Sequence, residues 1–247
     1  MCIRDSSKRL HKGLLKRVER GKLEQGKMDE LLLMINFTTD MKQAAEADLV
    51  IEAIVENVEV KRSVFAELDG ICKEGAILGT NTSSISITEI ASATKRPEKV
   101  IGMHFFNPAT VMKLVEVIRG VHTSDETYAA VCEAAASIGK QPVEVKEYPG
   151  FVVNRILIPM INEAAGLVAE NIASVEDIDA AMKLGCNHPM GPLALGDLIG
   201  LDVVLAIMDT LNRETGDPKY RAHTLLRKMV RGGLLGKKTG RGFYTYR

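Results

Sequence analysis

The spacing of hydrophobic residues changes twice along this chain of 247 residues, and each change marks a different kind of structure. Residues 8–34 combine basic side chains with apolar ones at helical spacing, which predicts a helical segment. Between residues 48 and 145, short apolar runs alternate with amphipathic stretches. The expected strands are 48–55, 76–80, 100–105, 114–118 and 142–145, and the expected helices are 60–71, 87–93 and 124–138. This alternation predicts an α/β fold with an open, Rossmann-like and mostly parallel sheet of the dinucleotide-binding kind.

After Tyr148-Pro149-Gly150 the strand pattern stops and apolar residues recur only at helical spacing. The expected helices are 152–168, a second one capped by Ser174 with Asp177 three residues on, and a third from 191 to 211. We therefore expect two domains joined by a hinge at Pro149-Gly150. The first is a nucleotide-binding domain, residues 1–148, and the second is an all-helical domain, residues 149–247.

Composition excludes several classes of protein. Lys plus Arg and Asp plus Glu both number 32, so the net charge is zero and no global field favours nucleic acid or an anionic membrane. The four cysteines form no Cys-x-x-Cys pair, which argues against zinc, iron–sulfur and disulfide frameworks. No apolar run is long enough to span a bilayer. We expect a cytoplasmic protein with no metal and no nucleic-acid or membrane partner.

His104 is the first candidate for chemistry, because an imidazole titrates near neutrality and can take a proton from a hydroxyl group. It lies at the end of a predicted strand, near the carboxyl edge where open α/β sheets bind ligands. A lone histidine in such a place is more often structural. The other four, His11, His122, His188 and His223, have no metal-binding spacing and are interpreted as structural or surface residues.

Glu116, Ser83 and Asn154 are polar residues that suit the same reaction. Glu116 lies on the next predicted strand among apolar neighbours, where it could accept the second imidazole N–H instead of facing solvent. Ser83 and Asn154 could donate hydrogen bonds to an oxygen that carries developing charge. The alternative for Ser83 is a cap on the helix that follows, and for Asn154 a polar residue at a helix start.

Four short segments carry a resemblance to a known family. They are Asn81-Thr82-Ser83-Ser84, Met103-His104-Phe105-Phe106-Asn107-Pro108, Leu114-Val115-Glu116-Val117 and Gly150-Phe151-Val152-Val153-Asn154-Arg155. Together they resemble the 3-hydroxyacyl-CoA dehydrogenases, in particular the bacterial short-chain branch, from about residue 11 to Arg247. The His-Phe-Phe-Asn-Pro context favours a catalytic role for His104 over a structural one.

The resemblance implies an oxidoreductase of fatty-acid or butyrate metabolism that interconverts (S)-3-hydroxyacyl-CoA, in particular 3-hydroxybutyryl-CoA, and 3-oxoacyl-CoA by hydride transfer. It also implies a homodimer, with the helical domain as the substrate and dimerisation domain. It implies that His104, Glu116, Ser83 and Asn154 are catalytic or contact substrate, with His104 as base and Glu116 as its partner. NAD is the implied cofactor, and NADP is not excluded. The implied cofactor contacts are Glu56, Lys61, Ser83, Asn107 and Lys238. As isolated residues, most of these would be ordinary surface positions.

A cluster of basic residues lies near the start of the chain and has two interpretations. Its members are Lys8, Arg9, Lys12, Lys16, Arg17, Arg20 and Lys22. In similar proteins this helix touches the coenzyme A nucleotide, and the cations could bind its phosphates. A solvated helix face explains most of them equally simply.

The glycine-rich nucleotide loop of the family is not found, since no Gly-x-Gly-x-x-Gly occurs in these residues. Residues 1–7 are expected to be foreign or miscalled sequence, and the strand near Val50 is expected to leave an apolar edge. Without the loop, the pyrophosphate loses its backbone N–H donors, so we expect the chain as written to bind the nicotinamide cofactor weakly.

Two alternatives remain open at this point. One is a non-catalytic protein, either crystallin-like or truncated, that only dimerises or binds coenzyme A. The other is a β-hydroxyacid dehydrogenase, which shares the β-α-β layout but uses a central lysine where this chain has His104.

Overall fold

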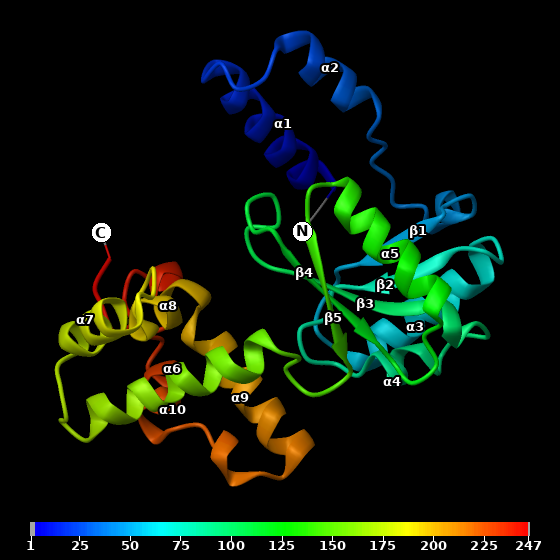
Figure 1. Ribbon diagram of the computed structural model, residues 1–247. Helices are drawn as coiled ribbons and strands as arrows, with labels where there is room; N and C mark the ends of the chain where they lie inside the picture. Colours follow the sequence, from blue (N-terminus) through cyan, green and yellow to red (C-terminus); the bar gives the residue numbers. More distant parts are fainter. Residues whose placement is uncertain (1–2, 247) are drawn as a thin grey trace.

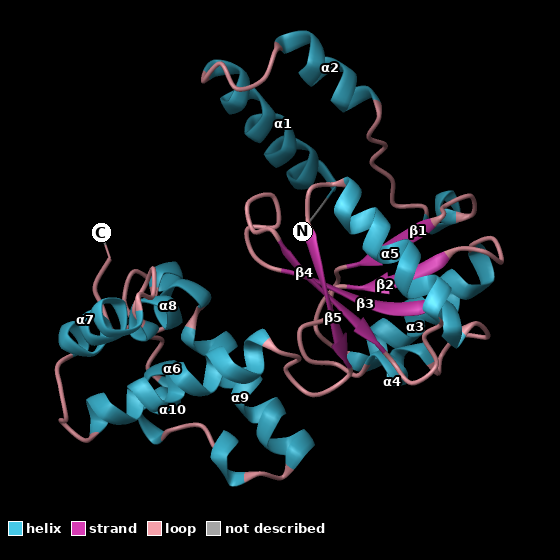
Figure 2. Cartoon of the chain, viewed as in Figure 1, coloured by secondary structure: helices cyan, strands magenta, loops and turns pink. Residues whose placement is uncertain are grey.

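The computed structural model describes residues 3–246, with side chains described from Asp5 onward. The sheet-containing part is made of α1 (Ile3–Glu19), α2 (Gln25–Leu33), β1 (Leu49–Glu52), α3 (Val58–Ile71), β2 (Ile77–Thr80), α4 (Ile87–Ala91), β3 (Val100–Phe105), β4 (Leu114–Arg119), α5 (Asp125–Ser137) and β5 (Gln141–Lys146). The helical part that follows is made of α6 (Val153–Ala169), α7 (Val175–Cys186), α8 (Pro192–Ile199), α9 (Leu201–Thr215) and α10 (Thr224–Arg231). Figures 1 and 2 show the two parts side by side, joined between β5 and α6.

The five strands form one sheet in the order β1-β2-β3-β4-β5. All neighbouring pairs are parallel except β3 and β4, which are antiparallel. The predicted α/β fold with a mostly parallel sheet is therefore confirmed, as is the change to helices alone. Strand β1 lies at one edge of the sheet, where the side chain of Ile51 is exposed.

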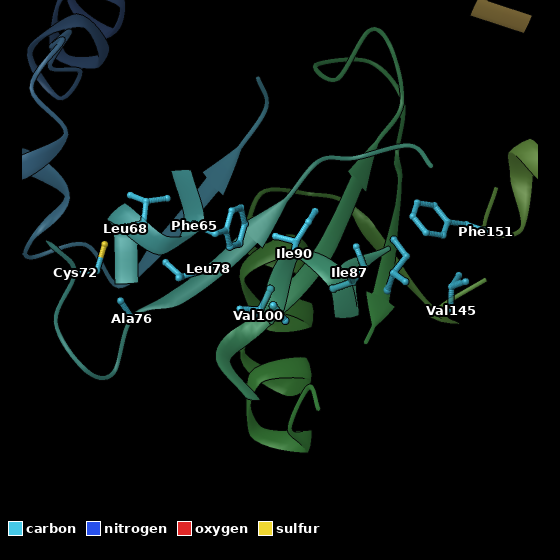
Figure 3. Packing of buried hydrophobic residues seen from close by; sticks show 12 residues of the cluster. Phe65, Leu68, Cys72, Ala76, Leu78, Ile87, Ile90, Val100, Val145 and Phe151 are labelled. Atoms are coloured by element: carbon cyan, nitrogen blue, oxygen red, sulfur yellow. The ribbon is translucent and has the colours of Figure 1, made fainter. Parts of the chain in front are cut away.

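Helices cover both faces of the sheet, and alternation along each strand decides which face a residue serves. On one face, α3 and α4 pack on Leu78, Val100 and Ile118, as part of the cluster drawn in Figure 3. On the opposite face, Ile101, Met103, Val115 and Val117 pack against Val131 of α5. His104 lies four residues after Val100 on β3, and Glu116 lies two residues before Ile118 on β4, so both share the face of Val100 and Ile118.

The helical part has its own core between α6, α9 and α10. Its buried members include Ile158, Ile161, Val204, Met208, Leu211 and Leu226, all of which are at most 1% exposed. Ser174 caps α7 by accepting a hydrogen bond from the backbone N–H of Asp177 at 3.1 Å, as its position predicts. The expected third helix is wrong as a single element, because Gly200, with φ of +103°, separates α8 from α9.

The segment before the sheet is a helical hairpin. Residues 8–34, expected to be helical, form most of α1 and α2 with a turn between them, and Figure 1 shows this pair extending away from the sheet. Residues 3–7, expected to be foreign, continue α1 without a break, whereas residues 1–2 lie outside the described part.

Candidate active site

His104 and Glu116 are brought together by the register of two strands. The antiparallel pairing of β3 with β4 places their Cα atoms directly opposite, and both side chains point to the same face. Nδ1 of His104 lies 2.7 Å from Oε2 of Glu116. Both residues are buried, with exposures of 5% and 1%. A carboxylate can only accept, so Nδ1 carries the hydrogen and Nε2 of the neutral ring keeps a free lone pair.

Glu116 also fixes the start of the helical part. Its second oxygen, Oε1, accepts hydrogen bonds from the backbone N–H groups of Val152 and Val153, at 3.1 and 3.0 Å. These groups lie at the amino-terminal end of α6, where unpaired N–H donors favour a negative charge. One carboxylate thus joins the imidazole on the sheet to the first turn of α6.

The imidazole is held between two aromatic rings. Its centroid lies 4.6 Å from that of Phe106 and 5.6 Å from that of Phe151, with tilted planes in both cases. Nε2 of His104 makes no hydrogen bond to any residue that the structure describes. The ring is therefore fixed in orientation and keeps one nitrogen free for another group.

Ser83 and Asn154 lie in segments that are hydrogen-bonded to the strands or side chains of this pair. Ser83 lies in the loop 81–86 after β2, and this loop is tied to β3 because Oδ1 of Asn81 accepts a hydrogen bond of 2.8 Å from the N–H of Phe105. Asn154 is the second residue of α6, next to the N–H groups that Glu116 binds. Neither side chain has a hydrogen-bond partner within the described part of the chain. The helix-cap alternative for Ser83 is wrong, because Ser86 caps α4.

Glu56 and Lys61 lie at the carboxyl edge of the sheet and contact each other, with Nζ of Lys61 3.3 Å from Oε2 of Glu56. Oε1 of Glu56 accepts hydrogen bonds from the hydroxyl of Thr82 at 2.6 Å and the N–H of Ser83 at 2.9 Å. Burial alone would raise the pKa of Glu56, but these two bonds and the charge of Lys61 hold the pKa below its usual value. Glu56 is therefore an anion that binds the Ser83 loop.

The remaining expected cofactor contacts are Asn107 and Lys238. Asn107 is exposed in the loop after β3. Lys238 lies in the short 3-10 helix η4 (Lys237–Thr239), where its Nζ is 2.6 Å from Oδ2 of Asp202 in α9. The structure gives Lys238 an acidic partner and does not bring it to His104.

A cleft of about 940 Å³ separates the loops at the carboxyl edge of the sheet from α9. Ser83, Glu56 and Asn81 line one side, Phe151 lines the hinge side, and Asp202 and Val203 line the opposite side. His104 does not line it, but its ring contacts Phe151. A large concave site between domains with convergent polar groups is typical of ligand binding.

Glu52 is a buried polar residue that no sequence signal reveals, because it lies within an apolar run and is 4% exposed. Its partners come from elements up to 28 residues away, and the pattern of a single strand cannot reveal them.

The basic residues of α1 and its following turn are exposed, in keeping with the solvated-face interpretation. Within residues 3–246 no group of three potential metal ligands occurs.

Comparison with known proteins decides the family. Residues 2–148 match the NAD-binding domain of 3-hydroxyacyl-CoA dehydrogenase, and residues 150–246 match the carboxyl-terminal domain of the same enzyme. The chain belongs to the 3-hydroxyacyl-CoA dehydrogenase family. It is an oxidoreductase of this class, and its His104 and Glu116 are in contact.

Named relatives of this 3-hydroxyacyl-CoA dehydrogenase family agree over almost the whole chain. The 3-hydroxybutyryl-CoA dehydrogenase of Clostridioides difficile is 62% identical over 96% of this chain and 84% of its own length. A probable 3-hydroxybutyryl-CoA dehydrogenase of Bacillus subtilis is 54% identical over 97% of this chain and 83% of its own. The crystal structure of (S)-3-hydroxybutyryl-CoA dehydrogenase from Ralstonia eutropha has a TM-score of 0.92 and 51% identity, covering 96% of this chain and 83% of that one.

The cofactor of a 3-hydroxyacyl-CoA dehydrogenase domain of this kind is NAD, and one end of its site fits the residues present. The cleft contains the anionic Glu56 and the unpaired hydroxyl of Ser83, which are polar groups of the kind that suit a ribose and a polar reacting group. For the pyrophosphate, these 247 residues contain no Gly-x-Gly-x-x-Gly turn.

In the part of the chain that the structure describes, no helix is long and apolar enough to cross a membrane.

Proposed function

We propose that this protein interconverts (S)-3-hydroxyacyl-CoA and 3-oxoacyl-CoA, with His104 as the general base. The observation that carries the proposal is the buried contact of 2.7 Å between Nδ1 of His104 and Oε2 of Glu116, which leaves Nε2 free. When bound, the nicotinamide cofactor supplies the acceptor or donor of the hydride. The residues of the chain supply the proton transfer and the orientation of the substrate.

In the oxidation direction, the substrate hydroxyl gives its proton to Nε2 of His104 while the hydride leaves the same carbon. The imidazolium that forms is stabilised by Glu116, which already accepts the Nδ1 hydrogen. Because Glu116 is also bound by two backbone N–H groups, it cannot turn away from the ring without losing them. In the reduction direction, the imidazolium returns the proton to the alkoxide oxygen.

Ser83 and Asn154 donate hydrogen bonds to the oxygen that alternates between alcohol and ketone. Each can serve both states, because a hydroxyl and an amide are neutral at every step. Their unpaired side chains support this assignment. Glu56, Lys61, Asn107 and Lys238 are proposed to contact the cofactor, with Glu56 and Ser83 nearest the reacting end.

The proposed substrate is a short acyl-CoA, 3-hydroxybutyryl-CoA or acetoacetyl-CoA, because the relatives described above carry names with that substrate.

We place the division between domains at residues 148 and 149, and we place the enzyme in the cytoplasm. A homodimer through the helical domain is supported by the exposed apolar side chains of Ile156, Ile172 and Leu184, at 68%, 63% and 87%. Light scattering during size exclusion tests it, and a monomer would refute it.

The test of the function is the loss of NADH absorbance with acetoacetyl-CoA. It is run on this chain and on a version extended with a β-α-β unit that carries a Gly-x-Gly-x-x-Gly turn, each beside its His104→Gln variant. We expect the extended version to be active, with a fall of at least about 100-fold on substitution, since general base catalysis contributes that much or more.

The outcomes separate the alternatives. Full activity in His104→Gln would refute His104 as the base. Activity in neither version would favour the non-catalytic alternative, whereas His104-dependent activity in both would show that the glycine turn is dispensable.

A further inference from the structure

Glu52 is a buried carboxylate at the end of β1 that does not line the cleft, yet both of its oxygens are bound. Oε1 accepts hydrogen bonds from Nζ of Lys61 at 2.7 Å and from the backbone N–H of Ile54 at 2.6 Å. Oε2 accepts a bond of 2.7 Å from the hydroxyl of Thr80 on β2. Glu52 thus joins two strands and helix α3 at the carboxyl edge of the sheet.

Lys61 extends this connection to the cleft. It is 1% exposed, and its ammonium group lies between two carboxylates, Glu52 at 2.7 Å and Glu56 at 3.3 Å. A buried lysine is stable only when paired, so the position of its head group depends on both anions. Removing the charge of one partner changes the forces on the other.

Glu56 connects Lys61 to the loop that carries Ser83. Besides the bonds to Thr82 and Ser83, its Oε1 lies 3.2 Å from both the N–H and the hydroxyl oxygen of Ser84. The loop 81–86 therefore has its backbone held by one carboxylate, which leaves the hydroxyl of Ser83 free toward the cleft.

We propose that Glu52 is a positioning residue, which acts through Lys61 and Glu56 to hold the Ser83 loop at the carboxyl edge of the sheet. The proposal rests on the proposed function for the part that concerns turnover. The buried pair of Glu52 and Lys61 costs more to desolvate than two apolar side chains of the same size, whereas the side chain of Glu56 is 40% exposed. Their effect is a fixed geometry. Thr80 and Ile54 fix the position of the Glu52 carboxylate, which fixes the ammonium group of Lys61. That ammonium group in turn fixes the carboxylate of Glu56.

The first variant is Glu52→Gln, which keeps the shape but removes the charge opposite Lys61. The readout is hydrogen exchange of the Ser83 and Ser84 amides in the purified chain, which needs neither cofactor nor substrate. We expect exchange to rise by about tenfold or more, because both amides lose a firmly placed acceptor. In the extended, active version we expect kcat to fall while KM for acetoacetyl-CoA changes little.

The matched control is Asp69→Asn. Asp69 lies in α3, as Lys61 does, and its side chain is 9% exposed. Its carboxylate pairs with Arg96 at 2.7 Å and accepts the N–H of Lys95, so it has no bond to the Ser83 loop. This variant tests loss of a partly buried ion pair without a link to Ser83. We expect a lower melting temperature, with the exchange of Ser83 and Ser84 and the value of kcat unchanged.

A double-mutant cycle tests the route. If Glu52 acts through Lys61, then Glu52→Gln adds nothing to Lys61→Met, whereas independent effects would add. Should Glu52→Gln fail to fold, Thr80→Val removes the hydroxyl that binds Oε2. Because this hydroxyl also accepts the N–H of Thr82 at 3.2 Å, the exchange of Ser83 and Ser84 is measured in Lys61→Met as well, which has no direct bond to the loop. Unchanged exchange at Ser83 and Ser84, or additive effects in the cycle, would overturn the proposal.

The two proposals can fail separately. Faster exchange in a protein with no dehydrogenase activity would support the role of Glu52 in the loop and refute the proposed function. Faster exchange with unchanged kcat in an active enzyme would overturn its role in positioning Ser83 for the reaction.

Discussion

Three glutamates at the sheet edge each bind several groups at once. Glu116 binds one imidazole and two backbone N–H groups, Glu56 binds a lysine and the Ser83 loop, and Glu52 binds the same lysine and two strands. A carboxylate offers about four acceptor positions, so a single side chain can fix several segments. The geometry at this edge therefore depends on the charge state of a few residues.

Glu56 should make stability depend on acidity. Its pKa is held below the usual 4.5 in the folded protein, so its stabilisation is complete above the unfolded value and is lost as pH falls through the folded value. We expect the free energy of unfolding of wild type to exceed that of Glu56→Gln by a constant amount above about pH 5 and by less at lower pH. Urea unfolding across a pH series measures this difference.

The control for this prediction is Glu59→Gln, a nearby glutamate at the start of α3 with a side chain that is 77% exposed. It should leave the pH dependence unchanged. A difference between wild type and Glu56→Gln that persists undiminished to about pH 3 would contradict the lowered pKa.

Gly242 lies against a buried carboxylate in the helical part. Asp197 is fully buried and accepts hydrogen bonds from the N–H groups of Phe243 and Tyr244 and from the hydroxyl of Tyr246. A Cβ atom at Gly242 would overlap Oδ1 of Asp197. We expect Gly242→Ala to lower the free energy of unfolding by about 3 kcal/mol, because the carboxylate must move away from its partners.

Urea unfolding compares this variant with Gly185→Ala, in helix α7, where a Cβ atom meets nothing within 4 Å. The control should be neutral or stabilised by up to about 1 kcal/mol, since alanine is the better helix former. Equal effects of the two substitutions would show that the contact with Asp197 is unimportant.

At the scale of elements, β4 and α6 meet through Glu116. In Glu116→Gln, an amide that keeps its oxygen on the N–H groups of Val152 and Val153 presents its NH2 group to Nδ1 of His104, which favours the tautomer with the hydrogen on Nε2 and removes the free lone pair. In the other orientation the NH2 group faces the two N–H donors of α6. We expect kcat in the active version to fall by about 100-fold or more. We also expect faster hydrogen exchange in the first turn of α6.

The comparison is Glu144→Gln on the neighbouring strand β5, whose carboxylate pairs with Arg119 at 3.5 Å and is 47% exposed. This variant should keep the activity and exchange of wild type. A Glu116→Gln enzyme with normal exchange in α6 but reduced turnover would show that Glu116 acts on the imidazole and does not stabilise the first turn of α6.

The elements that could be predicted from sequence are those whose pattern is local. Each apolar run between residues 48 and 145 contains a strand, and the change to helical spacing after Gly150 marks the end of the sheet. The pattern does not reveal the break at Gly200, because helical spacing continues on both sides of it. A Cβ atom at Gly200 would also meet Lys238, which comes from another element and is not part of the local pattern. Helix α10 is a second element that the pattern did not predict.

The site divides in the same way. His104 and Glu116 lie in short motifs on adjacent strands, so their meeting could be predicted from sequence. The role of Glu52 could not be predicted, because its partners Lys61 and Thr80 come from a helix and another strand. The pattern of a strand indicates which residues are buried, but not which groups they contact. Charged networks assembled from several elements are visible only after folding.

At the scale of the whole molecule, the cleft joins the sheet edge to α9, and any ligand that fills it contacts both parts. On the sheet side these 247 residues retain Glu56 and Ser83 but contain no Gly-x-Gly-x-x-Gly turn. Backbone N–H groups at such a turn bind the pyrophosphate of a dinucleotide, and hydrogen bonds to charged groups contribute about 1.5–3 kcal/mol each.

Loss of two such bonds corresponds to at least about 3 kcal/mol, or more than 100-fold in affinity. We therefore expect the Kd of NADH for the 247-residue chain to exceed that of the extended version by at least about 100-fold, measured by calorimetric titration. Acetoacetyl-CoA serves as the control ligand, because the residues proposed to bind it, Ser83, His104 and Asn154, are common to both versions. Similar NADH affinities in the two versions would mean that the contacts at the nicotinamide end are enough to hold the cofactor, and that the glycine turn contributes little to its binding.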